Sequence, residues 1–152
     1  MQPLMQIKSF LWTVLEQVLV LAGTLQPVAK KISIVMLGGS LGAASRYIIG
    51  LLTAKAWGTQ FPWGTLIVNL TGCFFIGLIF ALAERVRLLT PDMRLLLITG
   101  FLGALTTFSS FSLETVNAGR AGLTLQPLMN ILVNNLGGIA LTFVGLWLGG
   151  LK

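Results

Sequence analysis

Four long apolar segments follow one another along the chain and are separated by short, more polar linkers. They cover roughly residues 32–52, 63–83, 95–117 and 128–148. An α-helix of about 20 residues crosses a hydrocarbon core about 30 Å thick, so each segment is long enough to span a membrane. The linkers are too short to hold a folded domain outside the membrane. The pattern therefore predicts an all-α membrane protein with four transmembrane helices, whose function lies within the bilayer.

The first thirty residues follow a different pattern. Their apolar run, residues 10–22, is too short to span a membrane, and its polar side chains fall near one side of a helix. Lysines flank the run on both sides. We expect residues 1–30 to form an extension that lies at the membrane interface as an amphipathic helix, ahead of a four-helix domain at residues 31–152. A signal peptide or a gene-start extension are the alternatives, although no small-residue cleavage site follows cleanly.

Composition narrows the chemistry. The chain has 152 residues, of which 55% are hydrophobic and 9% charged, whereas soluble domains are about 25% charged. It contains no histidine, which removes most hydrolytic and proton-relay chemistry and argues against an enzyme. Its single cysteine, Cys73, excludes an intramolecular disulfide and a thiolate metal cluster. The net charge of +6 is spread over the ends of the apolar segments, which indicates membrane anchoring rather than a nucleic-acid partner.

Small and polar residues inside the apolar segments predict how the helices pack. Gly38 and Gly42 form a small-xxx-small pair, which lets two helix backbones approach closely in lipid. Four short helices enclose little interior, so a pore or cavity requires a second subunit. Two segments also carry polar stripes with a spacing of four residues. These stripes either form interhelical hydrogen bonds or line a path through the membrane. The stripes carry amide and hydroxyl donors but no acidic residue to pair with them, which favours a path. The stripes are Thr65, Asn69, Cys73 and Gly77, and Asn130, Asn134, Gly138 and Thr142.

The third segment contains five hydroxyl side chains and two glycines between Gly100 and Ser112. Hydroxyls compete for backbone hydrogen bonds, so this stretch predicts a broken helix in mid-membrane. Freed carbonyls at such a break can coordinate a cation. Phe108 and Phe111 are three residues apart and share a helix face. Their positive ring edges can hold a small anion beside Asn and Ser donors, although such pairs are more often packing.

Three stretches of sequence carry a family resemblance. They are GSLGAASRY at 39–47, PWGTLIVNLTG at 62–72 and GFLGALTTFSSFS at 100–112. In this order and spacing they closely resemble the CrcB/Fluc family of fluoride channels, over about residues 32–150. The resemblance implies a small four-helix protein that assembles as an antiparallel, dual-topology dimer and passively exports cytoplasmic fluoride. It also implies two pores along the dimer interface and a structural sodium ion at its centre.

The resemblance assigns roles by position. It implies that backbone carbonyls of Gly103 and Thr106 from both subunits hold the sodium ion. It makes Asn69 the pore amide and Phe108 and Phe111 the residues that present ring edges to fluoride. The fourth segment departs from the family, because two asparagines and a glycine replace the expected hydroxyl and aromatic residues. The resemblance therefore does not assign the residues of the exit path. The other implied positions are a polar track, a fourth-segment hydroxyl and a basic residue near a pore entrance: Ser110, Glu114, Thr115, Thr142 and Arg46.

The positive charges bear on orientation. With four spans, the N-terminus, the second linker and the C-terminus lie on one side, which carries most of the basic residues and predicts cytoplasmic termini. Without the first thirty residues the two sides of the membrane carry nearly equal numbers of basic residues, which is compatible with insertion in both directions. We therefore expect an antiparallel homodimer in the inner (plasma) membrane, with a heterodimer of a reversed partner as the alternative. A small multidrug-resistance-type exporter and a non-transporting membrane subunit are the rival functions; the exporter relies on an acidic residue in the first span, which here has only Arg46.

Overall fold

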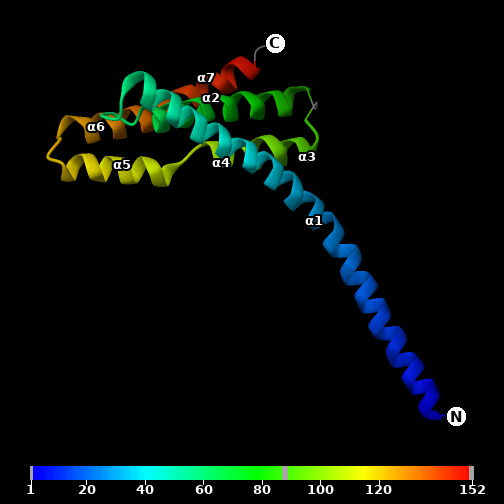
Figure 1. The fold of residues 1–152 in the computed structure, drawn as a ribbon. Coiled ribbons are helices and arrows are strands. Elements are labelled where there is room, and N and C mark those ends of the chain that lie inside the picture. Colours follow the sequence, from blue (N-terminus) through cyan, green and yellow to red (C-terminus); the bar gives the residue numbers. More distant parts are fainter. Residues whose placement is uncertain (1, 87–88, 151–152) are drawn as a thin grey trace. The chain divides into compact units, whose positions relative to one another are not determined.

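The computed structural model describes residues 2–86 and 89–150, and all regular elements within them are helices (Figure 1). The chain divides into two compact units, Met1–Ser33 and Ile34–Lys152. Helix α1 (Gln2–Trp57) begins in the first unit and ends in the second. The other elements all belong to the second unit. They are α2 (Trp63–Val86), α3 (Pro91–Arg94), the π-helix η1 (Leu95–Leu102), α4 (Gly103–Leu105), α5 (Phe108–Arg120), α6 (Leu125–Leu132), the π-helix η2 (Val133–Gly137) and α7 (Gly138–Gly150).

The number of spans predicted from the sequence is confirmed. Four helical runs in the described part of the chain are long and apolar enough to cross a membrane. They are Leu11–Trp57, Trp63–Glu84, Pro91–Arg120 and Leu125–Gly150. Two of the charges used above to assign orientation, Arg87 and Lys152, lie outside the described residues.

The helices are longer than the apolar segments, so the linkers are shorter than expected. The expected linker 53–62 shrinks to 58–62 because α1 continues through Ala and Lys residues, which are good helix formers. The helix ends where Gly58 adopts a φ of 77°, a left-handed conformation typical of the residue that follows a helix. Gly122, the second residue after α5, has a similar φ of 79°. The sequence pattern also separates the first span from the extension at residue 31, whereas α1 runs without interruption through this point.

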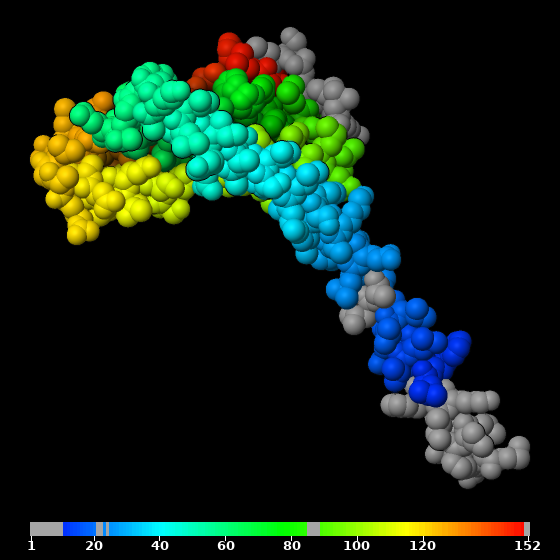
Figure 2. Space-filling model, in the orientation of Figure 1, coloured from blue at the N-terminus to red at the C-terminus, as the bar shows by residue number. Residues whose placement is uncertain are grey.

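The second half of α1 packs closely on the third run of helices. A Cβ at Gly38 would collide with the Leu96 carbonyl oxygen, and one at Gly42 with the Phe101 carbonyl oxygen. The predicted close approach through this glycine pair is therefore confirmed. Figure 2 shows the last turns of α1, in cyan and blue-green, lying against the rest of the second unit. Beneath this contact lies a small core formed by Val68, Leu102 and Leu105.

Helices α2 and α7 run side by side, green and red in Figure 1. Gly77 lies against the Thr142 carbonyl, and Gly145 lies against the Phe74 carbonyl, so each helix has a glycine facing the other's backbone. The Thr142 hydroxyl donates across the contact to the Cys73 carbonyl at 3.1 Å. The small residues of both polar stripes therefore serve helix packing.

The third run begins with a capped helix and contains the predicted break. Thr90 is the N-cap of α3, and its hydroxyl accepts from the Met93 backbone N–H at 3.2 Å, with Pro91 in the first turn. The helix is interrupted at Thr106 and Thr107, which have φ/ψ of −79°/155° and −151°/115°. Helix then resumes at Phe108. The π-helical turns before this break were not predicted.

Candidate functional site

The interruption opens into a hollow of about 330 Å³. Five of the residues expected at the site line it, namely Asn69, Gly103, Thr106, Phe108 and Phe111. They come from α2, α4, the break and α5, and they are brought together because the non-helical residues lie directly beside α2. A Cβ at Gly72 would overlap the Thr106 methyl group, which shows how close the two segments are. The remaining lining is mostly apolar and includes Ile76, Ile98, Leu102, Cys73, Thr107, Asn134 and Asn135.

Asn69 holds the break against α2 through both ends of its amide. Its Oδ1 accepts from the Thr107 backbone N–H at 2.8 Å, and its Nδ2 donates to the Thr107 carbonyl at 3.2 Å. The Asn69 oxygen thus replaces the helical acceptor that the Thr107 N–H gives up. The Asn69 nitrogen adds a second donor to the Thr107 carbonyl, which as the N-cap carbonyl also accepts the first hydrogen bond of α5. Thr107, only 7% exposed, also caps α5, because its hydroxyl accepts from the Ser110 N–H at 3.1 Å. The predicted pore amide is therefore also the main polar support of the break.

A row of three asparagines, Asn69, Asn134 and Asn130, crosses from α2 to the fourth run of helices. Asn69 Nδ2 donates to Asn134 Oδ1 at 3.0 Å, and Asn134 Nδ2 donates to Asn130 Oδ1 at 2.9 Å. Asn130 Nδ2 in turn donates to Thr115 Oγ1 on α5 at 2.8 Å. We call these three residues the asparagine row. Sequence reasoning placed Asn130 and Asn134 on a polar stripe but did not connect them to Asn69, because this requires knowing which helix faces which.

The two phenylalanines of the site differ sharply in exposure. Phe111 is 7% exposed, whereas Phe108 is 77% exposed. Their ring centroids are 5.6 Å apart and their planes are tilted by 51°. The pair thus extends from the core of this chain to its surface, beside the amide of Asn69. Phe108 presents most of its ring to whatever lies outside the single chain.

The backbone carbonyls of Gly103 and Thr106 lose their helical donors at the break. In a continuous helix they would accept from the N–H groups of Thr107 and Ser110. The Thr107 N–H donates instead to Asn69, and the Ser110 N–H donates to the Thr107 hydroxyl. Carbonyl oxygens are hard ligands, which suit a hard cation. Among the described residues no group of three or more His, Cys, Asp or Glu side chains is placed to hold a metal.

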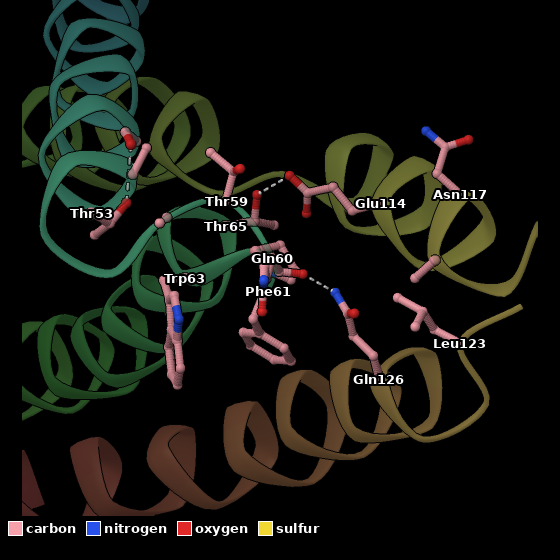
Figure 3. A pocket seen from close by; sticks show the side chains of 16 residues that line it. Thr53, Thr59, Gln60, Phe61, Trp63, Thr65, Glu114, Asn117, Leu123 and Gln126 are labelled. Atoms are coloured by element: carbon pink, nitrogen blue, oxygen red, sulfur yellow. Dashed lines mark hydrogen bonds between the residues drawn. The ribbon is translucent and has the colours of Figure 1, made fainter. Parts of the chain in front are cut away.

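A second hollow, of about 430 Å³, lies near the far end of α5 and is shown in Figure 3. Glu114 points into it, and its Oε1 accepts from the Thr65 hydroxyl at 2.7 Å. Its Oε2 is buried and has no hydrogen-bond partner in the described part of the chain. The side-chain amide of Gln126 donates to the Gln60 carbonyl across the same hollow. Thr65 and Asn69 belong to one polar stripe, so α2 links the two hollows.

Three further expected residues line neither hollow. Arg46 is half-buried on α1 and lines neither hollow. The Thr142 hydroxyl donates to the carbonyls of Cys73 and Gly138 and serves the α2–α7 contact. Ser110 is half-buried and receives a hydrogen bond from the Thr107 hydroxyl at 3.1 Å. Sequence reasoning missed Thr107 itself as the residue that receives Asn69, although its position within the Thr-Thr-Phe-Ser-Ser run is a signal for a helix N-cap.

Comparison with known proteins gives the family. The model of the family described as CrcB-like protein, Camphor Resistance (CrcB), matches residues 33–146. The chain belongs to the CrcB family. The CrcB match includes α2 and both hollows, and it begins at the end of the first compact unit.

Several relatives of this CrcB chain carry the name fluoride-specific ion channel FluC. The one from Legionella pneumophila (strain Lens) is 45% identical over 111 residues, which is 73% of this chain and 83% of the relative. The one from Dehalococcoides mccartyi (strain CBDB1) is 45% identical over 114 residues, 75% of this chain and 88% of the relative. The one from Aquifex aeolicus (strain VF5) is 46% identical over 115 residues, 76% of this chain and 93% of the relative.

Proposed function

We propose that this CrcB-family protein is a fluoride-specific ion channel that lets fluoride leave the cytoplasm passively and so reduces its toxicity. The observation that carries the proposal is the hollow at the break, where Asn69, Phe108 and Phe111 converge. The names of the relatives, fluoride-specific ion channel FluC, support the choice of ion. An ion channel catalyses no reaction, which is consistent with a chain that contains no histidine.

The chemistry of the hollow suits a small anion. Fluoride is strongly hydrated, so a selective path must replace its water with hydrogen-bond donors while letting the ion leave again. The positive ring edges of Phe108 and Phe111 are neutral donors of this kind, and so is the hydroxyl of Ser110, which lies beside Thr107. The Asn69 amide joins them in this proposal when its nitrogen exchanges one of its two hydrogen bonds within the chain for the ion. Neutral donors bind an anion without the strong attraction of a fixed positive charge, which favours release.

The rest of the path continues along α5 towards the second hollow. Glu114 and Thr115 lie on this helix, and Thr65 links Glu114 to the polar stripe of α2. We assign Ser110, Glu114 and Thr115 to the polar track, Thr142 to the fourth-segment hydroxyl of the fluoride path, and Arg46 to a pore entrance. An arginine at an entrance raises the local concentration of anions without binding them inside the membrane.

A second copy of the chain completes the site in this proposal. Gly103 and Phe108, at the break, are exposed in the single chain. Non-helical backbone at membrane depth is tolerated only when protein or water covers it. We therefore propose an antiparallel homodimer in the inner (plasma) membrane, with two pores along the interface. Tags attached at Lys152 should be accessible from both faces of the membrane. Access from one face only would leave a heterodimer with a reversed partner.

A sodium ion fits the oxygen ligands at the break. The carbonyls of Gly103 and Thr106, both deprived of their helical donors, would hold it together with the same carbonyls of the second copy. When bound, the ion supplies a positive charge that joins the two subunits and attracts fluoride in the nearby pores. The residues of this chain keep the carbonyls free, because Asn69 and Thr107 take the N–H groups that would otherwise occupy them.

The first unit has a separate role in this proposal, as an interfacial helix on the lipid surface. Its apolar side chains are exposed, from Leu11 at 59% and Trp12 at 64% to Val28 at 49%. The Trp12 indole donates to Glu16 at 2.9 Å, so polar groups of this segment bond along its own surface. A helix that combines exposed apolar residues with flanking lysines is typical of membrane-surface segments.

The function is tested by ion efflux from proteoliposomes that contain purified protein. We expect fluoride efflux to be abolished by Phe108→Ile and by Asn69→Asp, since the first removes the exposed ring edge and the second replaces a donor with an acceptor. Size-exclusion chromatography in detergent must show that each variant is folded and dimeric. Unchanged efflux in both folded variants would contradict the placement of the path at this hollow.

A further inference from the structure

The asparagine row closes a ring of hydrogen bonds through three helices. It starts at Thr107 at the beginning of α5, passes through Asn69, Asn134 and Asn130, and returns to α5 at Thr115. The Thr115 hydroxyl then donates to the carbonyl of Phe111 at 2.7 Å. The ring therefore ties the break, α2 and the fourth run of helices to the same short stretch of α5.

The ring uses every polar atom of the Asn69 side chain. Its oxygen accepts from the Thr107 N–H, and its nitrogen donates to the Thr107 carbonyl and to Asn134 Oδ1. A primary amide can turn by half a rotation and exchange its oxygen and nitrogen. The turned orientation would bring the Asn69 oxygen against the Thr107 carbonyl and Asn134 Oδ1, and its nitrogen against the Thr107 N–H. Thr107 and Asn134 therefore favour the same orientation, and Asn134 holds the amide in it from the fourth run of helices.

Asn134 is itself held in place by a buried neighbour. Its Nδ2 donates to both the carbonyl, at 3.0 Å, and the side-chain oxygen, at 2.9 Å, of Asn130. Asn130 is 1% exposed, one of the two largest fully buried side chains among the described residues. A buried amide keeps a single orientation when its partners are fixed, because an unpaired polar atom is costly away from water. Asn130 therefore fixes the orientation of the Asn134 amide, and Asn134 in turn holds the Asn69 amide in its observed orientation.

We propose that Asn134 and Asn130 are positioning residues, which fix the amide of Asn69 and so hold the break at Thr107. They act through Asn69 and need no contact with an ion. The effect on the backbone of the break stands on the hydrogen bonds alone, whereas the effect on fluoride flux rests on the proposed function. Asn134 and Asn130 therefore have a measurable role even where no ion is present.

Amide hydrogen exchange of Thr107 tests the positioning without any transport. The chain provides a matched control, since Asn135, the next residue of η2, donates to the carbonyl of Ile131 on its own helix at 2.8 Å. Asn134→Leu should raise the exchange rate of the Thr107 N–H by about tenfold, whereas Asn135→Leu should leave that rate near the wild-type value. A tenfold change corresponds to about 1.4 kcal/mol, which is within the range for interhelical hydrogen bonds in membranes. Equal rates in the two variants would overturn the proposal. If the leucine variants do not fold, the pair Asn134→Ser and Asn135→Ser decides in the same way.

Efflux of the single variant and a double-mutant cycle on exchange test the link to transport. Asn134→Leu should slow fluoride efflux by about tenfold per folded dimer, and it should raise the Thr107 exchange rate no further in a protein that already carries Asn69→Leu. Increases of the exchange rate that multiply in the double variant would show that Asn134 acts independently of Asn69 and would overturn the proposal. A raised Thr107 exchange rate in a protein that carries no fluoride would support the positioning while contradicting the proposed function, so the two failures are distinguishable.

Discussion

The close contact between α1 and η1 gives a prediction that the structure makes quantitative. Gly42 faces the backbone of the third run, and a Cβ there would collide with the Phe101 carbonyl oxygen and approach the Leu105 nitrogen at 3.0 Å. Both are backbone atoms, which cannot turn away as a flexible side chain can. Gly42→Ala therefore forces the two helices apart.

The magnitude follows from two opposing effects. Alanine stabilises a helix interior by about 1 kcal/mol relative to glycine. Overpacking a close contact destabilises by about 1–3 kcal/mol, and a collision with backbone belongs in the upper part of that range. We expect Gly42→Ala to lower the free energy of unfolding by about 1–2 kcal/mol in total.

A control lies three residues away on the same helix. A Cβ at Gly39 would lie 4.0 Å from the Ala104 Cβ and from the Gly100 carbonyl oxygen, which is ordinary contact. Gly39→Ala should therefore keep the stability of the wild type or raise it by up to about 1 kcal/mol. Unfolding in mixed micelles with increasing dodecyl sulfate, followed by tryptophan fluorescence, measures both variants. A Gly42→Ala variant as stable as Gly39→Ala would refute the close packing of α1 on η1.

Two further predictions concern the third run. Thr90→Ala removes the hydroxyl that accepts from the Met93 N–H, and we expect it to destabilise the start of this run by about 1 kcal/mol, measured as faster hydrogen exchange at Met93; an unchanged rate would argue against the cap. Gly103→Val should weaken dimer assembly and sodium binding, measured by analytical ultracentrifugation and equilibrium dialysis. Within its own chain a Cβ at Gly103 meets only the Ile98 carbonyl, at 3.6 Å, so we expect the valine to disturb the contact with the second subunit rather than the fold of the single chain. Gly119→Val, at a glycine in open space, is the control, and a Gly103→Val variant that is fully dimeric and sodium-loaded would refute the site.

Much of the fold follows from local sequence. Four apolar segments are enough to predict four spans, because hydrocarbon tolerates few alternatives to a helix. The break at Thr106 and Thr107 is predictable because consecutive hydroxyl residues compete with the helical backbone for hydrogen bonds. The contact at Gly38 and Gly42 is predictable from their spacing, since residues four apart share a helix face.

Other features depend on packing that no local pattern reveals. The π-helical turns of η1 and η2 follow sequences that are ordinary for an α-helix, so the extra residue in each turn was not expected. The partnership of Asn69 with Thr107 and Asn134 depends on the relative rotation of three helices. Spacing alone showed that Asn69 and Asn134 each belong to a polar stripe, but not that the stripes meet.

The central claim is that this chain forms a path selective for fluoride. The most direct measurement is the efflux of fluoride and of chloride from proteoliposomes loaded with each ion, with valinomycin to carry the counter-current of potassium and no proton gradient. We predict rapid fluoride efflux and chloride efflux no faster than from protein-free liposomes. Equal efflux of the two ions, or no fluoride efflux from folded dimeric protein, would contradict the account.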